Sequence, residues 1–109
     1  MIPRRRLAKR WLAVEGMKLV ARGYGIEVAV LMTGRTWEIA FARQIAIHLA
    51  VKVAELSYEE AGELFSRHRQ TVWMATKRVR DAVAVSSEAA RVVARYEAAL
   101  EAKKAKRRG

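Results

Sequence analysis

The chain has 109 residues, of which 52% are hydrophobic and 30% are charged, and its formal net charge is +11. This length allows one domain with one modest core. Because the chain contains no cysteine, its composition excludes disulfides, thiol nucleophiles and cysteine-ligated zinc sites. No apolar run approaches the length of a membrane span. We therefore expect a cytoplasmic protein that carries no metal or other cofactor.

The positive charge is concentrated at the two ends of the chain. Residues 1–10 carry five Lys or Arg and no acid, and residues 103–108 carry five more, so the segment between them is nearly neutral. We interpret residues 1–6 as a basic arm, residues 7–102 as a single helical domain and residues 103–109 as a basic tail. Such ends attract polyanions through counterion release, unless they serve only to keep the protein soluble.

The first third of the domain predicts two helices. An amphipathic helix over residues 7–21 is indicated by the face that carries Leu7, Trp11, Val14, Lys18 and Ala21. We expect Trp11 to lie in the core and the following Gly-Tyr-Gly run to end the helix. Residues 26–32 predict a short helix, and residues 33–37 a loop with one base, Arg35. An arginine in a loop is either solvated or available to enter a narrow minor groove.

A long amphipathic helix is predicted from Thr36 or Trp37 to Leu56. Its apolar stripe should make it the central element of the core and consists of Phe41, Ile45, Leu49, Val53 and Leu56. Arg43 and Gln44 lie off this stripe, where they could donate hydrogen bonds to phosphate oxygens. We interpret His48 as a packing or surface residue rather than a metal ligand.

Residues 57–84 predict a helix-turn-helix. Ser57 and Glu60 have the spacing of a capping box, which satisfies free backbone amides at the start of a helix. Gly62 offers a surface without a side chain, against which a second helix can pack closely. Residues 66–68 form the predicted turn. The buried face of the second helix carries Val72, Thr76, Val79 and Val83.

Charge is separated between these two helices. Residues 66–80 hold five Lys or Arg and no acid, whereas residues 55–63 hold four Glu and no base. An ordinary amphipathic helix also has a charged, solvated side. The short turn and the polar cluster at the start of the second helix nevertheless favour contact with DNA. The residues predicted to discriminate between bases are Arg67, His68, Arg69, Gln70 and Thr71.

A last helix is predicted from Glu88 to about Ala102, capped by Ser86 or Ser87. Its apolar face carries Val92, Tyr96 and Leu100. Two interpretations of this face stay open at this point. It either closes the core or forms a small homodimer seam.

Several spaced motifs resemble the C-terminal DNA-binding domain, domain IV, of the bacterial replication initiator DnaA. The resemblance covers about residues 18–81 and is carried by the run Ala-Arg-Gln-Ile-Ala-Ile-His-Leu-Ala from Ala42, by Leu56-Ser57 through Leu64-Phe65, and by Thr71-Val72. It implies an all-α, Trp-repressor-like fold with a helix-turn-helix. It also implies sequence-specific binding to double-stranded DNA, with the helix-turn-helix in a major groove and the basic loop before the long helix, which carries Arg35, at an adjacent minor groove.

The resemblance also assigns individual roles. By position, Arg35 is the minor-groove candidate, and Arg67 and Thr71 match the arginine and the second threonine of the family signature. Phosphate contacts are expected from Arg43, Gln44, Lys77 and Arg78.

The chain departs from the family pattern in the turn and in its length. The signature Gly-Gly-Arg-Asp-His-Thr-Thr-Val is replaced by the shorter run from Ser66 to Val72, in which His68, Arg69 and Gln70 stand for Asp, His and Thr. Arginine suits guanine and glutamine suits adenine, so we expect a target that differs from the initiator's own box. The chain contains no phosphate-binding loop, so we expect no ATPase activity.

The sequence therefore predicts a small bacterial or phage regulator of transcription or replication initiation, associated with the nucleoid. One alternative is a nonspecific architectural nucleic-acid-binding protein that depends on its basic ends. Another is a protein-interaction module that uses the Tyr96 face. With two histidines and one aspartate, the chain offers no catalytic triad or metal-ligand set, so we do not expect an enzyme.

Overall fold

The computed structural model describes residues 4–108, which form an all-helical domain without strands. Its six helices are α1 (Arg4–Gly23), α2 (Val28–Thr33), α3 (Trp37–Lys52), α4 (Tyr58–Phe65), α5 (Arg69–Val85) and α6 (Ser87–Arg108). The predicted all-α fold class and helix-turn-helix are thus confirmed. No helix in this range is long and apolar enough to cross a membrane.

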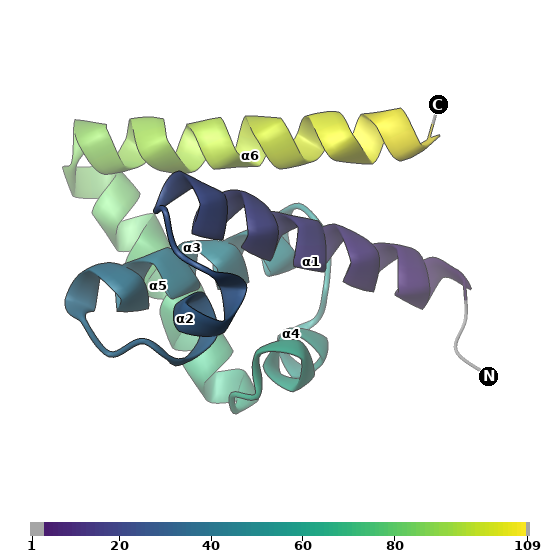
Figure 1. The fold of residues 1–109 in the computed structure, drawn as a ribbon, viewed down its shortest axis with the longest axis horizontal. Helices are drawn as coiled ribbons and strands as arrows, with labels where there is room; N and C mark the ends of the chain where they lie inside the picture. The colour runs from purple at the N-terminus through teal and green to yellow at the C-terminus, as the bar shows by residue number, and fades with distance from the viewer. Residues whose placement is uncertain (1–3, 109) are drawn as a thin grey trace.

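The helix α3 is the centre of the fold, as predicted. It packs against α1 on one side and α5 on the other, and α6 lies across both α1 and α5 (Figure 1). Ile45 and Leu49 of α3 have no solvent exposure. Because α3 contributes to the core along most of its length, it fixes the positions of the helices around it.

The core face of α1 differs from the predicted one. Trp11 is 36% exposed, and the guanidinium carbon of Arg107 lies 4.5 Å from the centroid of its ring. The buried residues of α1 are instead Leu12, Ala13, Gly16, Met17, Val20 and Ala21. Small residues on this face allow close approach, since a Cβ added to Gly16 would lie 3.2 Å from Leu100 Cδ2. Apolar residues surround much of α1, so their spacing alone did not identify the inner face.

The helix α3 ends at Lys52 and not at Leu56. Val53 is its C-cap, and Glu55 adopts a left-handed conformation with φ 63°. Hydrogen bonds from Ala54 N to Leu49 O and from Leu56 N to Ala50 O, both 3.0 Å, close the end of the helix. Residues on both sides of this break remain buried, and the apolar pattern therefore continues although the helix does not.

The basic ends described by the structure are helical. The helix α1 begins at Arg4 rather than Leu7, and Arg6 contacts α4 through Glu63 at 3.2 Å. The rest of the predicted arm, residues 1–3, lies outside the described residues. The helix α6 continues to Arg108, so the predicted tail is a helical extension up to that residue.

Contacts with the body of the protein hold the extension of α6 in place. Lys104 Nζ donates to Val53 O at 3.1 Å, and Lys103 Nζ lies 3.4 Å from Glu15 Oε1. At the other end of α6, Ser86 is the cap, since its Oγ accepts from Ala89 N at 3.1 Å. Leu100 is fully buried, so the apolar face of α6 closes the core. The homodimer seam remains a prediction.

Candidate nucleic-acid interface

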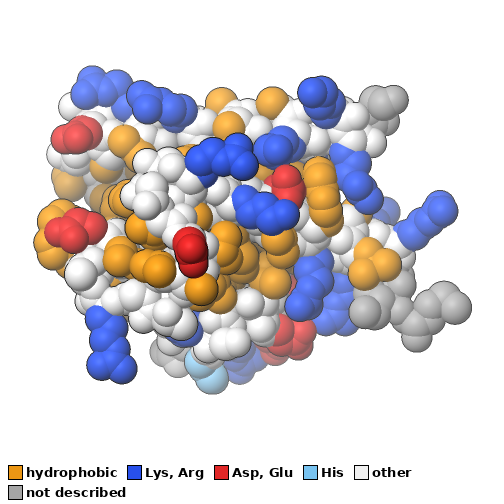
Figure 2. Space-filling view, viewed as in Figure 1, with side chains coloured by type: hydrophobic (Ala, Val, Ile, Leu, Met, Phe, Trp, Pro, Cys, Tyr) orange, Lys and Arg blue, Asp and Glu red, His pale blue; other side chains and the backbone are white. Residues whose placement is uncertain are grey.

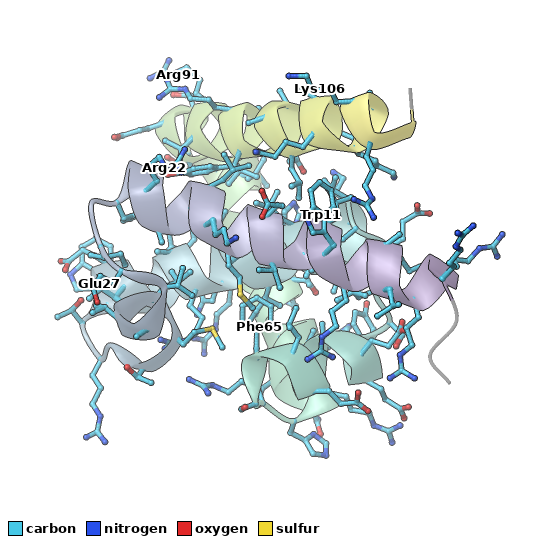
Figure 3. All side chains as sticks on the ribbon, turned by 45° about the vertical axis from the view of Figure 1, so that its right-hand side comes forward. Trp11, Arg22, Glu27, Phe65, Arg91 and Lys106 are labelled. Atoms are coloured by element: carbon cyan, nitrogen blue, oxygen red, sulfur yellow. The ribbon has the colours of Figure 1, made fainter. Side chains whose placement is uncertain are left out.

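The capping box predicted at the start of α4 is present. Glu60 N donates to Ser57 Oγ at 3.0 Å, and Ser57 N donates to Glu60 Oε1 at 2.9 Å. The backbone hydrogen bond from Ser57 lowers the pKa of the Glu60 carboxyl, because it favours the charged form. These reciprocal bonds fix where α4 begins. At the other end of α4, Phe65 is fully buried in the core; its position is labelled in Figure 3.

The turn after α4 depends on Gly62 and Ser66. Ser66 is left-handed, with φ 54°, and Arg67 N donates to Gly62 O at 2.9 Å. A Cβ added to Gly62 would lie 2.6 Å from Arg67 O, so the backbone passes too closely for a side chain at this position. A close approach at Gly62 was predicted for the second helix, but the turn at Arg67 makes it instead, and Arg69 N at the start of α5 would lie 3.5 Å from the same Cβ. This close approach sets the angle at which α5 leaves α4.

The start of α5 presents a row of polar side chains to solvent. His68 is the N-cap of α5, and its Nδ1 accepts from Gln70 N at 3.1 Å. This bond requires an unprotonated Nδ1 and orients the imidazole. The side chains of His68, Arg69, Gln70 and Thr71 are all exposed. They occupy the part of a recognition helix that contacts base edges in helix-turn-helix proteins.

A groove of about 550 Å³ lies between α3 and α5. It brings together seven of the predicted site residues, namely Arg43, Gln44, Arg67, His68, Gln70, Thr71 and Arg78. Ala40, Ile47, Met74 and Ala75 complete its walls, so none of its lining residues is acidic. The groove therefore offers a positive, hydrogen-bonding surface to an anion.

Two arginines of the groove also hold backbone carbonyls. Arg43 Nη1 donates to Leu31 O and Gly34 O, each at 3.0 Å. Arg67 Nη2 donates to Met32 O at 3.0 Å, and its Nη1 donates to the carbonyls of its own turn. Arg43 thus attaches the end of α2 to α3. Arg67 attaches it to the turn of the helix-turn-helix. The sequence did not indicate these bonds, because carbonyl acceptors are present at every position.

The environment of Arg43 shows the electrostatic character of the groove. Burial lowers the pKa of Arg43, and the positive charge of Arg67 lowers it further. Two cations face the same space, and no carboxylate lines it. A bound phosphate would reduce the repulsion between Arg43 and Arg67 and would accept hydrogen bonds from their remaining N–H groups.

Three predicted site residues lie outside the groove. Arg69 Nη1 bonds Glu59 Oε1 at 3.0 Å, and Lys77 Nζ bonds Asp81 Oδ2 at 2.9 Å. Both ion pairs are solvent-exposed. Arg35 is exposed in the connection between α2 and α3.

One exposed aromatic residue was not predicted as part of the interface. Trp37 is 77% exposed at the first position of α3. It precedes Ala40 by three residues and Gln44 by seven, and both of these line the groove. Residues at this spacing share one helix face, so Trp37 extends the α3 wall of the groove towards Arg35. The same spacing in the sequence could have identified it.

Comparison with known proteins gives one finding that bears on this interface. The family model described as bacterial DnaA protein helix-turn-helix matches residues 17–79. This range includes every residue that lines the groove. No curated protein and no solved structure matches the chain.

Within residues 4–108, no three His, Asp or Glu side chains are placed to hold a metal ion.

Proposed function

The chain belongs to the family of the bacterial DnaA helix-turn-helix, and we propose that it binds particular double-stranded DNA sequences as a small regulator. It acts on transcription or replication initiation by occupying duplex sites, without ATPase activity. The observation that carries this proposal is the acid-free groove beside the exposed start of α5. A helix start of this kind enters a major groove, while the walls around it meet the phosphates.

Base discrimination is assigned to His68, Arg69, Gln70 and Thr71. Arg69 suits the paired acceptors of guanine, and Gln70 suits the donor and acceptor of adenine. The sequence also placed Arg67 in this group. Its hydrogen bonds to three carbonyls support a different role, in which Arg67 positions the end of α2 against the turn.

Phosphate contacts are assigned to Arg43, Gln44 and Arg78, which line the groove, and to Lys77 on the exposed side of α5. Arg43 would combine this contact with its hold on the α2–α3 connection. That connection carries Arg35, which we propose enters the adjacent minor groove. Bonds to phosphates set the register of the protein on the duplex but do not read its sequence.

The proposal is tested by binding of the Arg69→Ala and Gln70→Ala variants to duplexes that differ at single base pairs. Loss of one base contact should cost about 1–3 kcal/mol and relax preference at one position. Arg91→Ala is the matched control, since Arg91 is exposed on α6 outside the groove. An equal loss of affinity for every duplex would exclude base reading by α5. It would favour the alternative of nonspecific attraction.

A further inference from the structure

A second hollow, also of about 550 Å³, lies at the end of the molecule where α1 begins and α6 ends. Its polar and aromatic walls are Arg5, Lys9 and Trp11 from α1, Glu55 from the connection after α3, and Lys104 and Arg107 from α6. It shares no lining residue with the groove between α3 and α5. The resemblance that the family match records does not explain it, because its basic residues all lie outside residues 17–79.

Two contacts hold the basic walls of this hollow together. The Arg107 guanidinium lies over the ring of Trp11, which Figure 3 labels on α1, at 4.5 Å from its centroid. This contact joins the end of α6 to α1. Lys104 Nζ donates to Val53 O and Glu55 Oε2, both at 3.1 Å, and joins α6 to the end of α3. A stacked guanidinium keeps its in-plane N–H donors available. The hollow therefore presents positioned donors rather than a free tail.

The charge of the hollow indicates an anionic ligand. Four Lys or Arg and one Glu line it. Figure 2 also shows several Lys and Arg side chains on the right-hand side of the molecule, where α1 begins and α6 ends. A binding site for single-stranded nucleic acid needs exposed ring faces on which bases stack. Here Arg107 covers a face of Trp11, which favours the phosphates of a duplex.

The hollow is not an extension of the groove between α3 and α5. Its walls come from α1, the end of α6 and the connection after α3, whereas the groove lies on the α5 side of α3. The central helix α3 packs between α1 and α5 and separates the two surfaces (Figure 1). Two cationic surfaces on different sides of one domain can hold two segments of DNA at once.

We infer that the hollow formed by Arg5, Lys9, Trp11, Lys104 and Arg107 binds the phosphate backbone of a second duplex, so that the protein bridges two DNA molecules. This inference rests on the proposed function, because the first duplex is held by α5. The second contact reads no sequence. It depends on salt with a slope set by the number of phosphates that the hollow neutralises.

The test is a capture experiment with the full chain at about 150 mM salt, where exposed charges are screened beyond about 8 Å. A duplex that carries the protein's binding site, obtained by selection from a random pool of duplexes, is fixed to beads. A labelled duplex without that site is supplied in solution. The triple variant Arg5→Gln/Lys9→Gln/Arg107→Gln removes charge from the hollow. The control Arg22→Gln/Arg91→Gln/Arg95→Gln removes the same charge from exposed positions outside it, and Arg22 and Arg91 lie at the other end of α1 and α6 (Figure 3).

We expect the hollow variant to capture about tenfold less labelled duplex than the control, while both bind a short duplex with the site as wild type does. Equal capture by the two variants would overturn the inference. This result is also the one expected if a protein dimer bridges the two duplexes, because the hollow would then play no part. A loss by the hollow variant on a single long duplex would assign the hollow to flanking phosphates of the same DNA. Failure of the wild type to bind the short duplex would instead reject the proposed function, and circular dichroism checks that each variant is folded.

Discussion

Arg69 illustrates how one residue of the interface is held before DNA binds. Its Nη1 lies 3.0 Å from Glu59 Oε1, and the two side chains are 65% and 71% exposed. A pair as exposed as this contributes little to stability. In the proposed complex, Glu59 competes with a base for the Arg69 guanidinium. Under that proposal, Arg69 exchanges a carboxylate partner for a guanine when DNA binds.

Replacing Glu59 should strengthen DNA binding. In Glu59→Gln the Arg69 guanidinium loses its competing carboxylate, and we expect affinity for the selected duplex to rise about two- to fivefold, the range of an exposed ion pair. Fluorescence anisotropy at fixed salt measures the change. Glu88→Gln, on the exposed start of α6, is the matched control. A gain of the same size in both variants would mean that only net charge had changed.

At the scale of elements, the turn between α4 and α5 is the most constrained part of the interface. Two positions of the turn have different requirements. The position of Gly62 leaves no room for a side chain, and that of Ser66 requires a left-handed backbone. The chain has serine where the family signature has glycine. A left-handed conformation costs a residue with a Cβ about 1 kcal/mol.

Substitutions in this turn should have opposite effects on stability. Gly62→Ala places a Cβ against Arg67 O, and overpacking of this kind costs about 1–3 kcal/mol. Ser66→Gly relieves the left-handed strain and should stabilise by up to about 1 kcal/mol. Urea unfolding followed by circular dichroism measures both changes. A neutral Gly62→Ala would contradict the close backbone approach in the turn.

The contact between α3 and α6 should make stability depend on acidic pH. Burial raises the pKa of Glu97, but hydrogen bonds from His48 and Lys52 outweigh it and hold the pKa below the ordinary value of 4.5. A carboxyl with a lowered folded-state pKa stabilises above its unfolded-state value, and this contribution is lost as pH falls through the folded-state value. We expect Glu97→Gln to reduce the free energy of unfolding by about 1–2 kcal/mol at pH 7.

In the same variant, the free energy of unfolding should fall less steeply than in wild type as the pH drops below about 4.5. Denaturant unfolding between pH 3 and 7, roughly the range in which carboxyl groups titrate, measures it. Glu101→Gln, at an exposed position one turn further along α6, is the control. An unchanged pH profile in Glu97→Gln would show that the bonds to His48 and Lys52 do not contribute.

The sequence predicted the elements whose signals are local. The capping box at Ser57 and Glu60 fixed the start of α4, and the spacing of Val72 and Val79 identified the buried face of α5. It did not predict features that depend on distant partners. The apolar pattern after Lys52 continues through a break in the helix, and the extension of α6 is held by carbonyl and carboxylate acceptors that no local pattern marks.

In the candidate site, too, the sequence predicted the features with local signals and missed those that depend on distant partners. Arg43, Gln44, Thr71 and Arg78 were predicted, and the structure brings them into one groove. The attachment of Arg43 and Arg67 to the end of α2 was not predictable, because the bonds join positions up to 35 residues apart. The exposure of Trp37 was missed for a different reason. An apolar residue at a helix start is usually assigned to the core.

At the scale of the whole molecule, basic residues line two surfaces on different sides of α3. The groove along α5 combines cations with residues that we propose to read bases. The hollow at the start of α1 and the end of α6 offers cations without such residues. The excess positive charge of the chain lies in its two ends. Basic residues from both ends line the hollow, where they can attract a polyanion.

The central claim is that the start of α5 reads base sequence. It is tested most directly by selection of bound duplexes from a random pool at about 150 mM salt, where nonspecific attraction is weakened. Wild type and the double variant Arg69→Ala/Gln70→Ala are compared. We predict an enriched motif for wild type and loss of one or two of its positions in the variant. The claim would be contradicted if wild type enriched no motif, or if the variant enriched an unchanged one.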